Sequence, residues 1–151
     1  MKGRERQKEN DLFFVCSVIE YIGRMTKNNR SEIVSKVGKT ELQRLMDLAD
    51  VFHCEPIEKT ASELIDRYGI TEGNFDNVAE CKYNVPTFFD IGKVYKRLVL
   101  SIARAENLPI IDALIKVYSS WVDKKIQDYN SSMYFENPEY LFESYKAGYP
   151  L

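Results

Sequence analysis

Apolar residues in this chain recur at intervals of three and four, and no segment keeps up the alternation of a β-strand. In the segment from about residue 9 to 26 they form two stripes, one made by Leu12, Val15, Cys16, Ile19 and Ile22 and the other by Phe14, Val18, Tyr21 and Met25. A helix that is apolar over two stripes is usually central and buried. This spacing predicts an all-α fold built around the first helix.

Capping residues and helix breakers mark where the other helices begin and end. Ser31 can cap a short helix that stops at Gly38, and Thr40 with Gln43 predicts a capping box for a helix over about 41–54. Later helices are expected over 57–68, 87–106, 109–128 and 138–146, bounded by Pro56, Gly69, Thr87, Asn107, Pro109 and Gly148. The sequence therefore predicts a single-domain bundle of six or seven helices, with a frayed lead at 1–8 and a long loop around 69–86.

The length and composition fit a soluble globular protein. The 151 residues can bury the core of one domain, and 44% hydrophobic and 29% charged residues are ordinary for that class. No apolar run approaches the roughly 20 residues of a membrane span, and Asp11 and Glu20 interrupt the apolar start where a signal peptide would be unbroken. Three cysteines without disulfide spacing favour a reducing compartment, so we expect a cytoplasmic protein.

The net charge of −2 is unevenly distributed. Residues 1–40 carry nine Lys/Arg and five Asp/Glu (+4), residues 41–80 carry three and ten (−7), and residues 81–151 carry nine and eight (+1). An acidic middle segment is unfavourable for a nucleic-acid surface and favourable for a basic partner protein.

The stretch LADVFHCE at 48–55 contains the only histidine. On the predicted helix, His53 continues the buried stripe one turn after Asp50, which suits a boundary histidine that bonds Asp50 or a backbone carbonyl. The alternative is a small enzyme centred on His53, with Asp50 or the loop residue Cys81 as its partner. That alternative predicts a concave pocket around His53.

The sequence contains no motif for a metal or a cofactor, and we expect neither. The available soft ligands are Cys16, His53, Cys54 and Cys81, without a CxxC or HxxxH pair. A single histidine does not supply a di-iron bundle, and the scattered glycines form no phosphate-binding loop. The carboxylate pairs Asp47/Asp50 and Glu63/Asp66 have helical spacing and are typical of solvated faces.

Residues 31–54 have the lengths of a helix-turn-helix with Gly38 at the turn. The exposed face of its second helix would carry Glu41, Gln43, Arg44, Asp47 and Asp50. This face is acidic on balance, which is unfavourable for contact with DNA phosphates. DNA binding through this degenerate motif is an alternative, and a nucleic acid is not the expected partner.

Aromatic residues gather between positions 129 and 149, namely Tyr129, Tyr134, Phe135, Tyr140, Phe142, Tyr145 and Tyr149. Tyrosine combines a large contact area with a polar tip and is enriched at interfaces. The segment either clamps onto its own bundle or presents a surface to a partner. The predicted partner-binding residues are Tyr134, Phe135, Tyr140 and Phe142, with Asp47 and Asp50 as steering charges.

The segment IIDALIKVYSSWVDKKIQDYNSSMYFENPEYLFESYKAG at 110–148 resembles the C-terminal part of small, uncharacterised bacterial helical proteins. The shared pattern is an acidic and aliphatic helix, a stretch ending in an aromatic (SSMYF), and Pro-Glu-Tyr opening a last helix. Some of these proteins lie beside ADP-ribosyltransferase-like genes arranged as toxin–antitoxin pairs. The resemblance therefore implies a partner-binding or neutralising role, and it assigns no functional residue.

These features together predict a non-catalytic, antitoxin-like protein-binding module that uses its aromatic C-terminal surface and its acidic middle segment. The expected partner is another protein with a basic surface or a second copy of this chain, and no membrane is involved. The enzyme centred on His53 and the DNA-binding protein are the alternatives.

Overall fold

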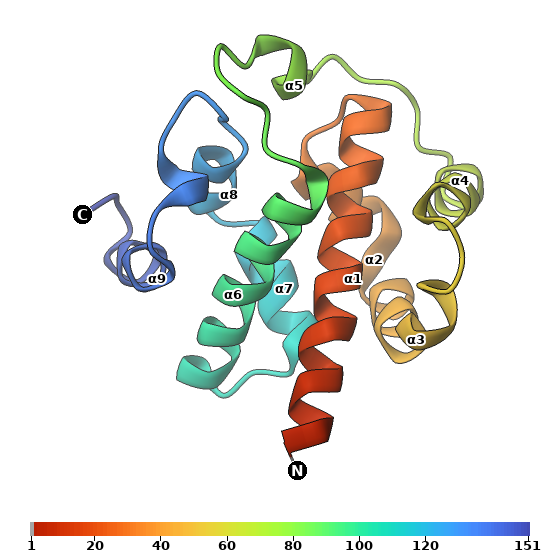
Figure 1. Cartoon of the computed structure of the whole chain (residues 1–151), viewed down its shortest axis with the longest axis horizontal. Coiled ribbons are helices and arrows are strands. Elements are labelled where there is room, and N and C mark those ends of the chain that lie inside the picture. Colours follow the sequence, from red (N-terminus) through yellow and green to blue (C-terminus); the bar gives the residue numbers. More distant parts are fainter. Residues whose placement is uncertain (1) are drawn as a thin grey trace.

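The computed structural model describes residues 2–151, with the side chains of that range except those of residues 2, 4 and 5. Throughout residues 2–151 the chain folds into nine α-helices and one short 3₁₀ helix, without a strand (Figure 1). They are α1 (Lys2–Thr26), α2 (Arg30–Asp47), α3 (Ala49–Phe52), α4 (Ile57–Arg67), α5 (Asn77–Glu80), α6 (Phe88–Glu106), α7 (Ile110–Tyr118), α8 (Trp121–Ile126), η1 (Met133–Phe135) and α9 (Pro138–Ala147). The predicted all-α bundle is confirmed.

Helix α1 runs through the middle of the molecule and packs against α6, α2 and α4 (Figure 1). All five residues of its first apolar stripe are buried, as predicted. In the second stripe Val18 is buried, Phe14 and Tyr21 are half-buried, and Met25 is exposed. The helix starts at Lys2, so the lead that we expected to be frayed is helical from that residue; Met1 lies outside the described residues.

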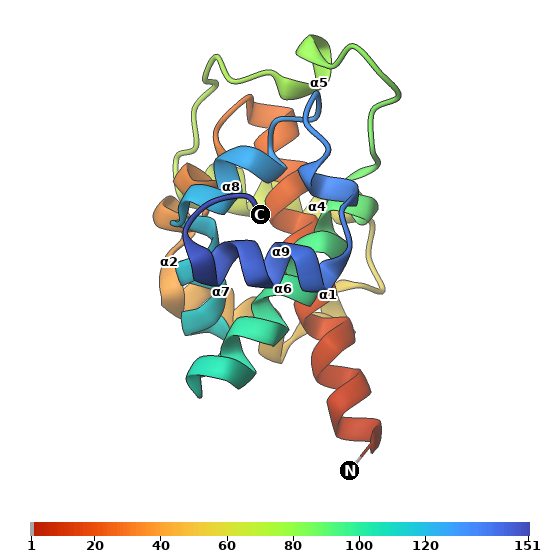
Figure 2. The same cartoon turned by 90° about the vertical axis from the view of Figure 1, so that its left-hand side faces the viewer.

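Helix α6 forms the second wall of the core. It begins at the predicted start, Thr87, and its N-terminus has a capping box in which the side chains of Thr87 and Asp90 each accept the other's backbone N–H at 3.0 Å. It ends at Asn107, which adopts the left-handed conformation with φ 53°. Helix α9 crosses α6 from the outside (Figure 2) and ends at Gly148 with φ 85°, where the sequence predicted its end.

Two predicted helices are divided. The helix expected over 41–54 breaks at Leu48 (φ −108°, ψ 15°), and the one expected over 109–128 breaks at Ser119 and Ser120. At the second break the Ser120 hydroxyl donates to the Val117 carbonyl at 2.6 Å, a local bond that competes with the helix ladder. None of the helices within residues 2–151 combines the length and the apolar composition needed to cross a bilayer.

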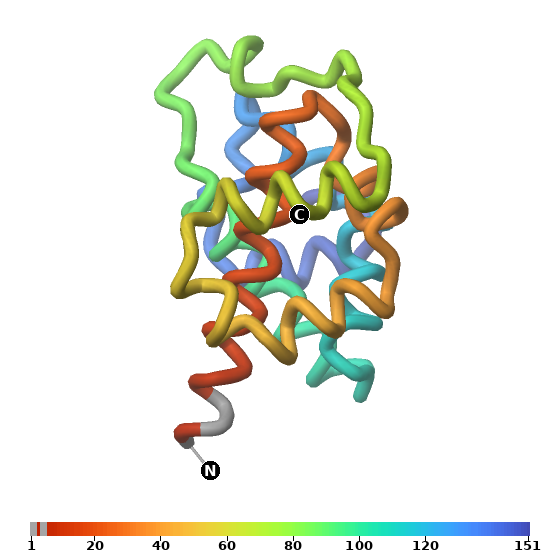
Figure 3. Tube along the Cα trace, turned by 90° about the vertical axis from the view of Figure 1, so that its right-hand side faces the viewer, coloured from red at the N-terminus to blue at the C-terminus, as the bar shows by residue number. Residues whose placement is uncertain are grey.

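The loop around 69–86 contains the short helix α5 and covers the end of the bundle opposite the N-terminus (Figure 3). Its backbone is tied to the α1–α2 turn, because the Gly73 N–H donates to the Thr26 carbonyl at 2.8 Å and the Phe75 N–H to the Lys27 carbonyl at 2.9 Å. Only a glycine fits at position 73, since a Cβ there would lie 2.3 Å from Oδ1 of Asn28.

Candidate functional site

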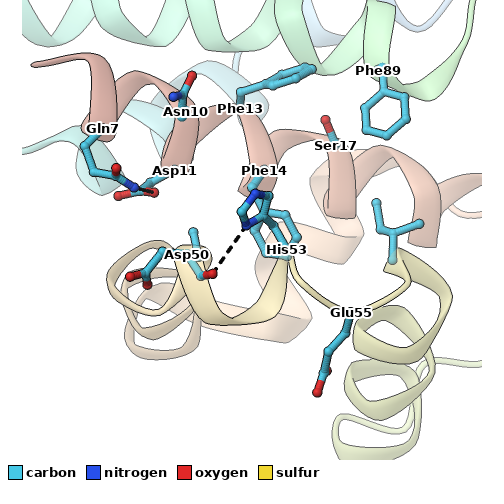
Figure 4. A pocket seen from close by; sticks show the side chains of 12 residues that line it. Gln7, Asn10, Asp11, Phe13, Phe14, Ser17, Asp50, His53, Glu55 and Phe89 are labelled. Carbon is cyan, nitrogen blue, oxygen red and sulfur yellow. Dashed lines mark hydrogen bonds between the residues drawn. The ribbon is translucent and has the colours of Figure 1, made fainter. Parts of the chain in front are cut away.

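A pocket of about 620 Å³ opens between the N-terminal half of α1, the α3–α4 bend and the first turn of α6 (Figure 4). Its apolar walls are Phe13, Phe14, Ala49, Ile57 and Phe89, and its polar lining is Gln7, Asn10, Asp11, Ser17, Asp50, His53 and Glu55. We call it the His53 groove. Pockets of this size with a mainly apolar wall and a few polar groups are typical of binding sites.

His53 lines this groove from the C-terminus of α3, the short helix that follows the break at Leu48. The chain leaves α2, makes the single turn of α3 and then bends again before α4. Pro56 precedes the first residue of α4 and, because it has no N–H to pair, it suits the start of that helix. Asp50 and His53 line the pocket from the α3 region, and Ile57 lines it from the first turn of α4, beyond the second bend.

His53 is exposed and caps the C-terminus of α3. Its Nδ1 lies 3.3 Å from the backbone carbonyl oxygen of Asp50, one of the partners expected for it. The prediction that His53 continues the buried stripe is wrong, because its side chain is exposed beyond the end of that stripe at Ala49. The same carbonyl accepts the Cys54 thiol at 3.3 Å. The pocket that the enzyme alternative requires around His53 is present as well.

The structure does not bring Cys81 to His53. Cys81 follows α5, its sulfur lies 3.4 Å from the Tyr83 carbonyl oxygen, and α5 is at the end of the molecule away from α3 (Figure 1). Cys16 is buried in α1, and burial raises the pKa of its thiol to about 12. No cysteine is among the described residues that line the groove.

The predicted acidic pairs lie on solvated surfaces. Asp47 is exposed on α2 and accepts a hydrogen bond from Gln43 at 2.9 Å, so Gln43 serves Asp47 rather than the predicted capping box with Thr40. The break at Leu48 separates Asp47 from Asp50. Over the part of the chain that the structure describes, no three His, Cys, Asp or Glu side chains are placed to hold a metal ion.

The aromatic C-terminal segment mostly packs on its own bundle. Tyr134, Tyr140 and Phe142 are half-buried against the core, and the Tyr140 hydroxyl donates to the Leu151 carbonyl at 2.7 Å. Phe135 is 68% exposed. Of the four predicted partner-binding aromatics, Phe135 alone presents most of its surface to solvent.

The segment predicted as a degenerate helix-turn-helix bends at Gly38, whose φ is 82°. Its second part does not expose Glu41, which we had placed on the outer face. Glu41 is buried and paired with Arg44 at 3.1 Å and with Arg67 of α4. The ion pair between Glu41 and Arg67 therefore connects α2 with α4.

A cluster of buried charged and polar residues, which was not predicted from the sequence, lies in the core. Glu20 of α1 and Arg30 of α2 are both fully buried, and Nε and Nη2 of Arg30 each donate to a different carboxylate oxygen of Glu20 at 3.0 Å. Gln127 donates to Glu20 at 3.0 Å, and the Tyr129 hydroxyl donates to it as well. Asn77 of α5 connects Arg30 with Gln127, because its side chain accepts from Arg30 at 3.1 Å and donates to Gln127 at 2.9 Å.

This buried network holds carboxyl groups with opposite pKa shifts. Burial alone would raise the pKa of Glu20, but the charge and hydrogen bonds of Arg30, with help from Arg24, lower it to about 2. At the other end Asp123 accepts from the Tyr95 hydroxyl at 2.5 Å, and burial raises the pKa of Asp123 to about 7. The network is closed to solvent and joins α1, α2, α5, α6 and α8, so we assign it a structural role.

The sequence carried one signal for this network. Glu20 interrupts the apolar run VCSVIEYIG on a helix that is apolar on two stripes. A carboxylate at such a position must be paired, because an unpaired buried charge is too costly. Its partner could not be identified, since Arg30, Gln127 and Tyr129 are brought to it by the tertiary fold.

Comparison with known proteins adds no relative. A scan against protein-family models and searches of curated proteins and of solved structures found no match to this chain.

Proposed function

We propose that this protein acts by binding another protein in the His53 groove, without a chemical step. The observation that supports this most is the groove itself, in which apolar walls from four helices, α1, α3, α4 and α6, meet a polar rim. The side chain of Phe89 on its wall is 51% exposed, although a phenylalanine is more stable when it is buried. Covering such a surface with a partner stabilises the complex, because apolar area leaves water.

The charge around the groove supports a basic partner. Asp50 and Glu55 on its rim belong to the segment 41–80, which carries a net charge of −7 (three Lys/Arg against ten Asp/Glu), and Asp11 adds a further carboxylate from α1. Charges at the rim of an interface contribute mainly to the rate of association and to partner choice. We therefore propose that the negative charge of Asp50 steers the partner toward the groove. Asp47, on the other side of the break at Leu48, adds to the same negative potential.

The C-terminal segment remains in the proposal as a secondary surface. Phe135 is exposed, and Tyr134 packs edge-on against its ring with centroids 5.0 Å apart. Tyr140 and Phe142 would then hold the segment in place rather than supply most of the contact. A module that covers its partner in this way could also block that partner's activity. This is the antitoxin-like role that the resemblance of 110–148 implies.

The second candidate is a small enzyme that uses His53, because the concave pocket on which it depends exists. One substitution distinguishes the binding module from the enzyme. His53→Gln removes the only imidazole of the chain yet keeps a polar side chain on the rim. Under the binding proposal this variant still captures the partner, whereas any turnover of a small molecule that depends on His53 favours the enzyme.

The experiment that tests the binding proposal compares two exposed phenylalanines. Tagged wild type, Phe89→Ser and Phe135→Ser are expressed in the native cell, and captured proteins are identified by mass spectrometry. We expect one dominant partner that is lost with Phe89→Ser and kept with Phe135→Ser, while circular dichroism shows both variants folded. Loss only with Phe135→Ser, or with the double variant Tyr134→Ala/Tyr140→Ala, would move the site to the C-terminal segment. No partner for the wild type would contradict protein binding.

A further inference from the structure

The two ends of the His53 groove differ in chemistry. Figure 4 shows Gln7, Asp11 and Asp50 at one end and Phe89 at the other, with His53 between them. The groove therefore has a direction: an occupant meets carboxylates at one end and aromatic rings at the other.

At the acidic end, two carboxylates have no cationic partner among the side chains that the structure describes. Asp11 accepts a hydrogen bond from Gln7 at 2.8 Å, and Asp50 is exposed. Within that described part, neither carboxylate belongs to an ion pair, whereas Glu55 on the same rim is paired with Lys59 at 3.1 Å. No lysine or arginine is among the described lining residues. A cation from outside complements this end.

The aromatic end suits an apolar group. The rings of Phe13 and Phe89 are 5.9 Å apart at a tilt of 48°, and the ammonium of Lys96 already lies 5.8 Å from the Phe13 ring centroid. A second cation is disfavoured beside Lys96, so the partner's charge belongs at the Asp11 and Asp50 end. An aromatic or branched aliphatic side chain fits against Phe89 and gains from covering it.

Building on the proposed function, we infer that the His53 groove selects a partner segment in which a lysine or arginine stands next to an aromatic or branched aliphatic residue. The apolar side chain covers Phe89, and the cation meets Asp11 and Asp50. A protein segment fits better than a free amine because the acidic surface extends beyond the groove, with exposed Asp47 on α2 and Glu58 on α4 available to further basic residues.

The chemistry is tested by titrating the protein with small probes while recording amide NMR spectra. The probes are phenylpropylamine, its anionic counterpart phenylpropionate, butylamine, and the blocked dipeptide acetyl-Phe-Lys-amide. We expect phenylpropylamine to bind about tenfold more tightly than phenylpropionate or butylamine, a difference of about 1.4 kcal/mol, with shifts confined to residues of the groove. The dipeptide should bind at least as tightly as phenylpropylamine.

Two variants separate the acidic end from general surface charge. Asp11→Asn/Asp50→Asn should remove the preference for the amine. Asp66→Asn, a control on α4 that is exposed and does not line the groove, should keep it. The inference is overturned if phenylpropionate binds as well as the amine, if Asp66→Asn has the same effect as the double variant, or if millimolar amine shifts no groove residue. It is also overturned if the free amine binds more than tenfold tighter than the dipeptide, since the groove would then be a small-molecule site.

These outcomes are independent of partner capture. A partner captured through Phe89 without any amine preference would leave the proposed function standing and remove the inferred specificity. An amine and dipeptide preference without a captured partner would support the specificity and count against the proposed function.

Discussion

At the scale of single residues, Gly23 decides whether the Glu20–Arg30 pair can be buried. A Cβ at this position would lie 2.2 Å from Cδ and 2.5 Å from Nε of Arg30, whose side chain has no exposed surface through which to move. An alanine in a helix interior is ordinarily stabilising relative to glycine. Here the contact should reverse that preference.

We predict that Gly23→Ala lowers the free energy of unfolding by about 1–3 kcal/mol, the usual cost of overpacking a core. Urea denaturation followed by circular dichroism measures it. Gly3→Ala is the matched control on the same helix, because nothing lies within 4 Å of its added Cβ, and it should leave stability unchanged or slightly raised. Equal stability of Gly23→Ala and wild type would mean that Arg30 is not packed on Gly23.

A second prediction concerns the charge of Glu20. Glu20→Gln leaves the buried guanidinium of Arg30 without its carboxylate, and removing one partner of a buried pair costs about 3–5 kcal/mol. The double variant Glu20→Gln/Arg30→Met should lose less than the sum of the two single variants, because no unpaired charge then remains. Exposed Glu63→Gln serves as the control in the same denaturation series. Additive losses would contradict the pairing.

At the scale of elements, the capping box at Thr87 fixes the first turn of α6 and with it the wall residue Phe89. We predict that Thr87→Ala lowers the free energy of unfolding by about 1 kcal/mol, since a backbone N–H at the helix start loses its acceptor. Thr40→Ala is the control, because Gln43 bonds Asp47 and the predicted box there is not formed. Thermal melts should show a lower Tm for Thr87→Ala and a wild-type Tm for Thr40→Ala.

Helical periodicity and caps predicted the elements well, because both depend on neighbours within a turn or two. The stripes of α1, the start of α6 at Thr87 and the end of α9 at Gly148 all follow from such local rules. The break at Leu48 does not, since the sequence around it carries no proline or glycine. Tertiary packing decides it, as Ala49 of α3 is buried beside α1.

The same distinction explains what was predictable about the groove. Asp50 and His53 could be identified from the sequence because they are three residues apart and His53 is the only histidine. Their companions Asp11, Phe14 and Phe89 belong to α1 and α6, and no local pattern connects them with position 53. A pocket between elements is a property of their packing, so its residue types could be recognised only in part.

At the scale of the whole molecule, the buried network links five helices and should make stability depend on pH in two opposite ways. The pKa of Asp123 is raised to about 7 from 3.8, so the folded state holds its proton more tightly and stability falls as pH rises through this interval, by at most about 1.4 kcal/mol per pH unit. The pKa of Glu20 is lowered from 4.5 to about 2, so its contribution is present above pH 4.5 and is lost as pH falls toward 2.

We therefore predict that Asp123→Asn flattens the loss of stability between pH 4.5 and about 7 and leaves the loss in acid unchanged. Urea midpoints measured across this range for wild type, Asp123→Asn and the exposed control Asp66→Asn give the comparison. Asp66→Asn should follow the wild type. A wild-type slope in Asp123→Asn would show that this carboxyl group is already ionised in the folded protein.

The closed network also has a consequence for recognising relatives of this chain. A lineage that keeps the Glu20–Arg30 pair must keep a residue without a side chain at position 23 and donors equivalent to Gln127 and Tyr129, whatever happens to the surface. Substitutions at these distant positions should therefore occur together. An acid, a glycine and an arginine near the start, matched by a glutamine and a tyrosine near the end, form a fingerprint that can outlast overall similarity.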